Sequence, residues 1–208
     1  MVKTLLFLAL LAASASAVQA QTSHLGIKAG GSLTSFVGKD VSSSSSAKLG
    51  VHGGLIANLD LSGRFSIQPE LLYSMKGTKD QRNSSGNTLT GYQTLHYVDV
   101  PILLKVKADQ LFFEAGPQLG VLVGATQTIE SGAASNSISD KANFNDLDFG
   151  YALGLGFQAP TGFLLGLRYN GGLKNIVKPV QGFGGNTIQP EARNSAFQLY
   201  VGYMFSGK

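Results

Sequence analysis

The sequence contains no cysteine, so the protein folds without disulfide bonds. Tryptophan is also absent, although 12 Phe and 7 Tyr supply aromatic side chains. Charged residues make up only 13% of the chain, against a usual value of about 25%. The formal net charge of +4 is scattered along the chain, which argues against a nucleic-acid partner. After residue 20, no apolar run approaches the roughly 20 residues that a membrane-spanning helix needs.

The first twenty residues have the features of a secretory signal peptide. Lys3 supplies a positive charge, and residues 5–11 read LLFLALL, a short apolar run. Val18 and Ala20 suit the −3 and −1 positions of a signal-peptidase site. We therefore expect residues 1–20 to be removed and residues 21–208 to form one mature domain outside the cytoplasm. A lipoprotein anchor is excluded because no cysteine follows the cut.

A period of two dominates the rest of the chain. The segment FSIQPELLYSMKG, at residues 65–77, places large apolar residues at alternate positions, which is typical of a β-strand with two unlike faces. Eight segments show such alternation. They span residues 24–36, 47–61, 64–76, 92–106, 111–124, 148–159, 163–172 and 194–205.

The connections between these segments alternate strictly between short and long. Tight turns are expected at residues 62–63, 107–110 and 160–162. The other four connections are long and rich in Ser, Gly, Asn and Thr, as expected of solvated loops. They span residues 37–46, 77–91, 125–147 and 173–193. This sorting is typical of outer-membrane barrels, which have short periplasmic turns and long extracellular loops.

The two faces of the predicted strands differ in a way that indicates which one points outward. One face is apolar in all eight segments and holds no charge, which suits lipid. The other face carries the charged residues together with many glycines, which suit the crowded interior of a small barrel. The sequence therefore predicts an all-β protein, an eight-stranded antiparallel transmembrane β-barrel, with the apolar face outward.

Inward-facing charges should pair within such a confined lumen. The inward acids are Glu70, Asp99, Glu114 and Asp148. The inward bases are Lys28, Lys48, Lys105 and Arg168. Because unpaired buried charges are costly, we expect a structural network with Arg168 near its centre, formed by Lys28, Glu70, Asp99, Glu114, Asp148 and Arg168. Such a network would plug the barrel.

Several strand segments resemble a known family. LGIKAGGSLTSF, FSIQPELLYSMKG, LHYVDVPILLKV, FFEAGPQLGVLVG, DFGYALGLGF, LRYNGGLKNI and the ending FQLYVGYMF are similar to the outer-membrane β-barrel family of Bacteroidetes, labelled PorT-like or porin-family. The resemblance implies the barrel fold and a location in the outer membrane. It implies no catalytic residues and does not by itself imply a pore.

Motifs that would indicate enzymatic chemistry are weak. GLGFQA at residues 154–159 matches a dinucleotide fingerprint but is followed by Pro160, not by a helix. His24, His52 and His96 lie in three different strands without metal-ligand spacing. No spacing selects a Ser and His pair, so we expect no enzyme, cofactor or metal.

Prolines interrupt three consecutive predicted strands at Pro69, Pro101 and Pro117. Proline removes a ladder hydrogen bond and usually avoids central strands. We therefore expect a β-bulge at each of these positions.

Three functional classes fit the pattern. The first is a plugged structural barrel that acts through its extracellular loops, in adhesion or in docking an unidentified ligand or protein partner. The second is a narrow channel for small solutes. The third, a soluble lipocalin-like binder, would need the glycine-rich face to point outward. The first two require the outer-membrane bilayer and the barrel-assembly machinery as partners. The ending with Tyr203 and Phe205 resembles the aromatic signal that this machinery recognises.

Overall fold

The computed structural model describes residues 23–84, 87–131, 134–181 and 185–205. The predicted signal peptide and its cleavage site before Gln21 lie outside these residues. Within the described ranges, no helix is long and apolar enough to cross a membrane.

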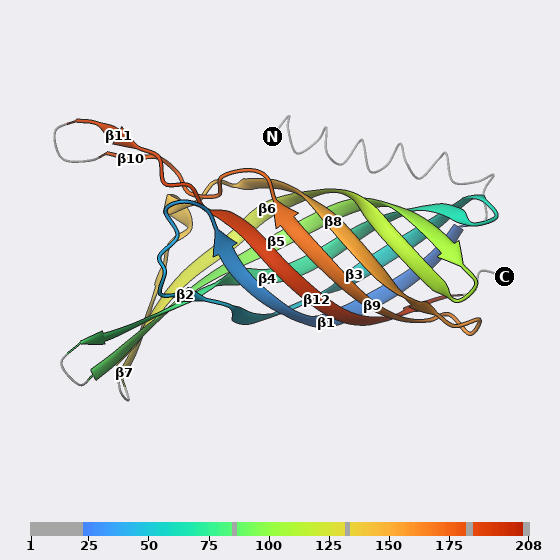
Figure 1. The fold of residues 1–208 in the computed structure, drawn as a ribbon, viewed down its shortest axis with the longest axis horizontal. Coiled ribbons are helices and arrows are strands. Elements are labelled where there is room, and N and C mark those ends of the chain that lie inside the picture. The colour runs from blue at the N-terminus through green and yellow to red at the C-terminus, as the bar shows by residue number, and fades with distance from the viewer. Residues whose placement is uncertain (1–22, 85–86, 132–133, 182–184, 206–208) are drawn as a thin grey trace.

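Eight antiparallel strands close into a ring (Figure 1). Their order around the ring is β4-β3-β1-β12-β9-β8-β6-β5, and β5 pairs again with β4. The fold class predicted from the sequence is therefore confirmed. The ring strands are β1 (Ser23–Val37), β3 (Lys48–Ser62), β4 (Phe65–Ser84), β5 (Asn87–Ala108), β6 (Leu111–Ser131), β8 (Leu147–Gln158), β9 (Phe163–Gly172) and β12 (Arg193–Met204).

The connections differ at the two ends of the ring. At one end, here called the turn end, the turns need few residues because Gly63, Asp109 and Gly162 adopt positive φ values. The opposite end, here called the loop end, carries the long connections (Figure 1). These contain β2 (Ser45–Ser46), β7 (Ala134–Ser139), the short 3-10 helix η2 (Lys141–Asn143), β10 (Val180–Gln181) and β11 (Thr187–Ile188).

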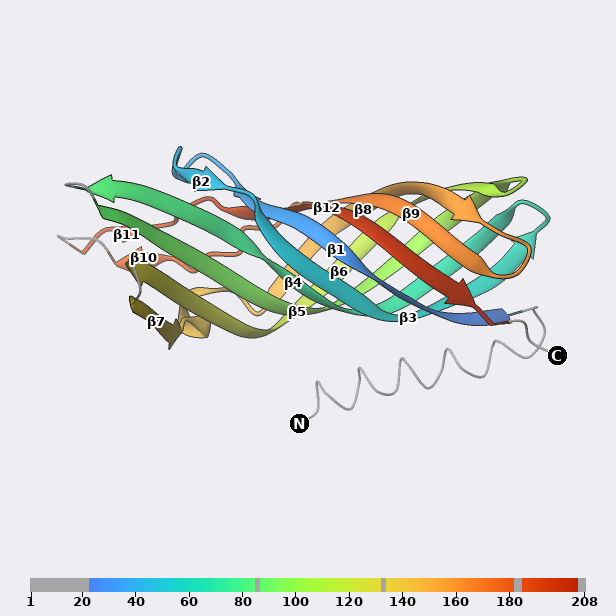
Figure 2. The same cartoon turned by 90° about the horizontal axis from the view of Figure 1, so that it is seen from below.

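Two of the predicted long loops, at residues 77–91 and 125–147, are largely strand in their described parts, so the strands extend further than predicted. Strands β4 and β5 stay paired from Leu72↔Asp99 out to Ser84↔Asn87, and β6 continues to Ser131, where it pairs with β7. The reason is composition, because Thr and Tyr favour strands as well as polar surfaces. The paired strands project beyond the ring (Figures 1 and 2).

The predicted bulges at the prolines are also wrong. The β4–β5 register is the same at Gln68↔Leu103 and Leu72↔Asp99, on either side of Pro69. The β5–β6 and β6–β8 registers likewise continue across Pro101 and Pro117. Instead, two consecutive residue pairs are missing from a strand pairing beside each proline, and the pairing then resumes in the same register. The missing proline N–H therefore removes a backbone hydrogen bond locally without shifting the strands. The β5–β6 register shift lies between His96 and Tyr97.

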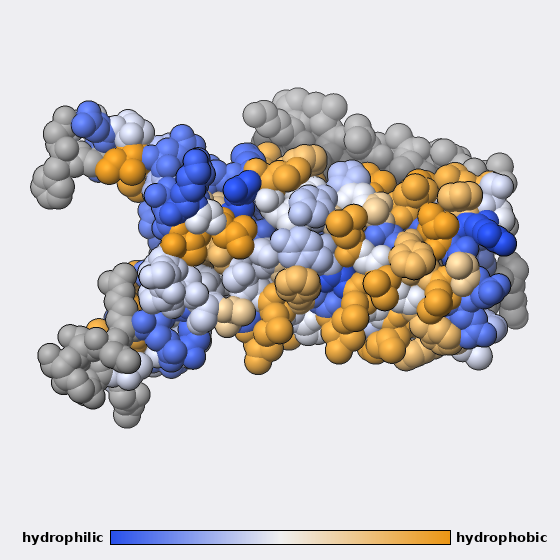
Figure 3. All heavy atoms as spheres, in the orientation of Figure 1, coloured by the Kyte–Doolittle hydropathy of each residue, from blue (hydrophilic) through white to orange (hydrophobic). Residues whose placement is uncertain are grey.

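The outer wall of the ring is apolar, as predicted (Figure 3). Leu55 on β3, Leu153 on β8 and Phe197 on β12 are each more than half exposed. Outward aromatic residues lie near both ends of the wall, as in the girdles of membrane barrels. Those nearer the turn end include Phe65, Phe113, Phe157, Phe163 and Tyr203, and those nearer the loop end include Tyr73, Tyr151, Tyr169 and Phe197.

Apolar clusters lie toward both ends of the lumen. The loop cap comprises Leu95, Tyr97, Leu122, Ala125, Phe144, Ile176 and Ala192. Three of these residues, Phe144, Ile176 and Ala192, come from the connections and not from the ring. The turn cap comprises Ile56, Phe112, Leu164, Tyr200 and Met204. Polar side chains lie between these clusters and also beside their members, as where Lys105 Nζ lies 4.0 Å from the ring centroid of Phe112.

Candidate functional site in the lumen

The charged side chains of the lumen lie in two groups, both deeply buried. Period-two alternation brings them inward, because the opposite side chains of the same strands form the apolar wall. Lys28, Glu70, Asp99, Lys105, Glu114, Asp148 and Arg168 are each at most 5% exposed. So much buried charge requires close pairing, and the contacts below supply it.

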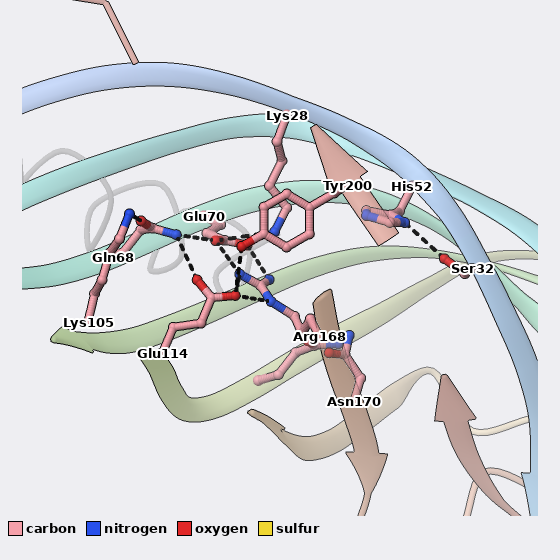
Figure 4. A network of polar contacts seen from close by, with 11 residues as sticks. Lys28, Ser32, His52, Gln68, Glu70, Lys105, Glu114, Arg168, Asn170 and Tyr200 are labelled. Atoms are coloured by element: carbon pink, nitrogen blue, oxygen red, sulfur yellow. Dashed lines mark hydrogen bonds and ion pairs between the residues drawn. The ribbon is translucent and has the colours of Figure 1, made fainter. Parts of the chain in front are cut away.

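Arg168 on β9 joins two carboxylates from other strands (Figure 4). Its Nη1 and Nη2 donate to Glu70 Oε2 and Oε1 at 2.7 and 2.8 Å, a bidentate pair. Its Nε donates to Glu114 Oε1 at 2.7 Å. The planar guanidinium thus crosses the lumen from β9 to β4 and β6, a geometry that lysine could not reproduce.

Further groups satisfy the remaining positions around these carboxylates. Lys28 Nζ lies 3.1 Å from Glu70 Oε2 and 4.0 Å from the ring centroid of Tyr200. The Tyr200 hydroxyl donates to Glu114 Oε1 at 3.0 Å, and Gln68 Nε2 donates to Glu70 Oε1 at 2.7 Å. We call Lys28, Gln68, Glu70, Glu114, Arg168 and Tyr200 the Arg168 network. Lys105 extends it by donating to Gln68 Oε1 at 3.2 Å.

Glycines make the space that this network occupies. A Cβ built on Gly154 would lie 2.6 Å from Glu114 Oε1, and one on Gly166 would lie 2.4 Å from Tyr200 Cζ. Both approaches are shorter than atoms tolerate. The strands accept glycine at these positions because the facing side chains fill the space instead.

A second group lies nearer the loop end. Lys76 Nζ is 3.0 Å from Asp99 Oδ1, 3.7 Å from Asp148 Oδ2 and 4.5 Å from the ring centroid of Tyr97. Asn194 Nδ2 donates to Asp148 Oδ2 at 2.8 Å. We call Lys76, Tyr97, Asp99, Asp148 and Asn194 the Lys76 network. It lies directly beneath the loop cap, to which Tyr97 also belongs.

The six site residues expected from the sequence fall into these two groups. Lys28, Glu70, Glu114 and Arg168 lie in the Arg168 network, and Asp99 and Asp148 lie in the Lys76 network. The inward base Lys48 is half-buried at the loop end of β3 and belongs to neither network. Sequence reasoning missed Lys76 as a partner, although it shares the parity of Glu70 along the same strand.

Sequence reasoning also missed the aromatic and amide side chains that contact the buried charges. Tyr200 and Tyr97 are 2% and 0% exposed and face inward, where only polar residues and glycines were expected. Asn194 stands at the start of β12, where the sequence gives no signal of a buried role. The buried roles of such aromatic and amide residues can be recognised only from their contacts with charged side chains in the structure.

A serine and a histidine, residue types that serve in nucleophilic catalysis, contact each other in the lumen. Ser32 Oγ lies 2.8 Å from His52 Nδ1, but both residues are at most 4% exposed, between the two caps. Across the described part of the chain, no cluster of three or more His, Cys, Asp or Glu is arranged to hold a metal ion.

The closed antiparallel ring, its apolar wall and its polar interior define a membrane β-barrel. The family model described as "Outer membrane protein beta-barrel domain" matches residues 19–178, and the chain belongs to that family. No curated protein matches the sequence significantly.

Solved structures with a similar arrangement are distant in sequence. Ail, the attachment invasion locus protein of Yersinia pestis, is 13% identical, with 88% of this chain and 99% of Ail covered and a TM-score of 0.47. Neisserial surface protein A is 11% identical, with 87% and 97% covered and a TM-score of 0.45. OprG from Pseudomonas aeruginosa is 9% identical, with 90% and 98% covered and a TM-score of 0.45.

Proposed function

We propose that the protein is a non-enzymatic outer-membrane barrel whose lumen is plugged and which acts through its loop end, by docking an extracellular ligand or partner. The observation that supports this proposal is the filling of the lumen by paired, buried charged side chains. Arg168 bridges strands across the ring, and apolar caps lie above and below the charged groups. An eight-stranded ring leaves room for side chains and little for solute.

The loop end offers surface for docking. The projecting β5–β6–β7 sheet exposes Leu89, Ile129 and Ile138, which are 39%, 49% and 53% exposed. Register places these three on neighbouring strands in diagonal contact positions. The β10–β11 hairpin exposes Val180 and Ile188, which pair with each other. Exposed apolar side chains above a membrane are suited to a partner.

Export and insertion belong to the same proposal. Residues 1–20 act as a signal peptide, so the protein isolated from membranes should begin at Gln21, and an intact Met1 on inserted protein would contradict this. The turn end then faces the periplasm. Phe205, whose ring lies 5.7 Å from that of Tyr203, contributes to recognition by the barrel-assembly machinery. Phe205→Ser should lower the yield in membranes, and an unchanged yield would count against that role.

Membership of the Bacteroidetes PorT-like or porin-family branch is also proposed, on the strand segments quoted above. One PorT-like branch works with a secretion machine for gliding and virulence proteins. No residue of this chain singles out that branch, so the docking role is stated without it.

A narrow channel is the second candidate, because the lumen is polar along its length. Liposome swelling distinguishes the two functions. Vesicles that contain the barrel should shrink and stay shrunken in arabinose, as empty vesicles do, if the plug holds. Swelling in arabinose at a rate that rises with barrel content would favour the channel.

A further inference from the structure

Besides Asp99 Oδ2, three oxygen atoms in or beside the Lys76 network have no hydrogen-bond partner among the described residues. They are Asp148 Oδ1, Asn170 Oδ1 and Asn194 Oδ1. Their residues are only 5%, 6% and 4% exposed. The other polar atom of each side chain is engaged: Asp148 Oδ2 accepts from Asn194 Nδ2 at 2.8 Å, and Asn170 Nδ2 donates to Gln118 Oε1 at 3.0 Å. Buried acceptors left without a donor or a cation are costly.

All three residues line one cavity of about 10 Å³. They stand on the neighbouring strands β8, β9 and β12, so their side chains approach the cavity from one side of the ring. Gly120, Gly150 and Gly172 line it as well and contribute no side chain. A cavity of this size holds one water-sized ligand, since a single water needs about 10–15 Å³.

The number of acceptors favours a cation over water. A water molecule has two hydrogens and can donate to only two of the three oxygens, whereas a cation can contact all three. Lys76, which also lines the cavity, is already directed to Asp99 Oδ1 and Asp148 Oδ2. The ligand set of one carboxylate and two amide carbonyls is all oxygen, as hard cations prefer.

We propose that this cavity binds one alkali-metal ion, with Asp148, Asn170 and Asn194 as its side-chain ligands. A single ligating carboxylate matches a single positive charge. Mg²⁺ retains several waters, for which there is no room. Lys76 pairs with Asp99, so a divalent ion beside Asp148 would leave one positive charge unmatched. Because the loop cap lies above the site, the ion enters as the loops fold onto the ring and then stabilises that closed arrangement.

Thermal unfolding of the purified barrel in a non-ionic detergent tests the proposal. The protein is refolded in NaCl, in KCl or in choline chloride at equal concentrations, and the heat-induced shift in gel migration gives the midpoint. In NaCl or KCl the midpoint should rise by about 3–5 °C per tenfold increase in salt above the dissociation constant. The larger rise identifies the preferred ion. Equal midpoints in all three salts would overturn the proposal.

Two variants separate the site from general salt effects. Asp148→Asn removes the charge but can still hydrogen bond to the neighbouring amides, so it should fold and lose the alkali-ion dependence. Asp146→Asn is the control, because its side chain is 67% exposed, and it should retain that dependence. A dependence that persists in Asp148→Asn would contradict the assignment.

A direct measurement makes the outcome independent of the variants. Crystals of the unmodified protein grown with thallium(I) should show an anomalous peak in the cavity, within ligand distance of the three oxygens. A peak only at the protein surface, or a water without anomalous signal in the cavity, would overturn the proposal.

Discussion

Arg168 is the residue on which the proposed closure of the lumen depends most. Its guanidinium contacts Glu70 and Glu114 through three nitrogens, and all three side chains are fully buried. No other base in the described lumen contacts both carboxylates by a hydrogen bond. Lys28 approaches Glu70 alone, so it cannot replace the bridge.

Arg168→Ala should therefore destabilise the barrel. Removing one partner leaves two buried carboxylates without their main counter-charge, which costs about 3–5 kcal/mol. The midpoint of urea unfolding in detergent measures the loss. Arg64→Ala, at the exposed turn between β3 and β4, is the control and should change little. Equal midpoints for the two variants would show that the Arg168 bridge does not contribute to the stability of the barrel.

Gly154 tests the packing of the same network. In Gly154→Ala the added Cβ would lie 2.6 Å from Glu114 Oε1 and 2.9 Å from the Leu167 carbonyl oxygen, so overpacking should cost about 1–3 kcal/mol. Gly31→Ala is the matched control, because its Cβ would meet nothing within 4 Å. A Gly154→Ala variant as stable as Gly31→Ala would contradict the crowding seen in the lumen.

Sequence alone predicts which residues face the lumen but not which of them meet. Alternation places Glu70, Glu114 and Arg168 on the polar face because side chains in a strand have a period of two. Whether they reach one another across the ring depends on the stagger of the strands, which no single strand encodes. Tyr200 could not be predicted as a partner, because an aromatic residue on the polar face has no charge to mark it.

At the scale of elements, the loop end is the part that sequence described least well. Residues 77–91 read as a loop because they are rich in Gly, Thr and Asn, yet residues 77–84 and 87–91 continue β4 and β5 and pair with each other. The connection between β9 and β12 is ordered by contacts that are distant in sequence. The Asn175 side chain donates to the Pro190 carbonyl oxygen at 2.6 Å and accepts from the backbone N–H groups of Val177 and Ala192.

Asn175→Ala should loosen the loop cap without unfolding the ring. The change removes three hydrogen bonds around Ile176, whose side chain is fully buried in the cap. Hydrogen exchange should become at least about tenfold faster at residues 173–178 and stay unchanged in β1 and β12, as expected of local opening. Gln189→Ala, exposed in the same connection, is the control. Uniform exchange in both variants would show that Asn175 does not hold the cap.

At the scale of the whole molecule, the two ends of the ring should face opposite sides of the membrane. The chain lacks cysteine, so single-cysteine variants report position without background. On intact cells a membrane-impermeant maleimide should label Ser135→Cys, in β7 at the loop end, and not Asp109→Cys, at the turn end. Labelling of Asp109→Cys alone would invert the orientation.

The central claim is that the lumen is closed, and planar-bilayer conductance tests it most directly. The claim rests on the Arg168 network, which spans the lumen, and on the apolar clusters toward its two ends. The unmodified protein should be nearly silent under an applied voltage, and Arg168→Ala, where it still folds, should show brief leak events. A steady open channel from the unmodified protein would contradict the plugged lumen and favour the channel function.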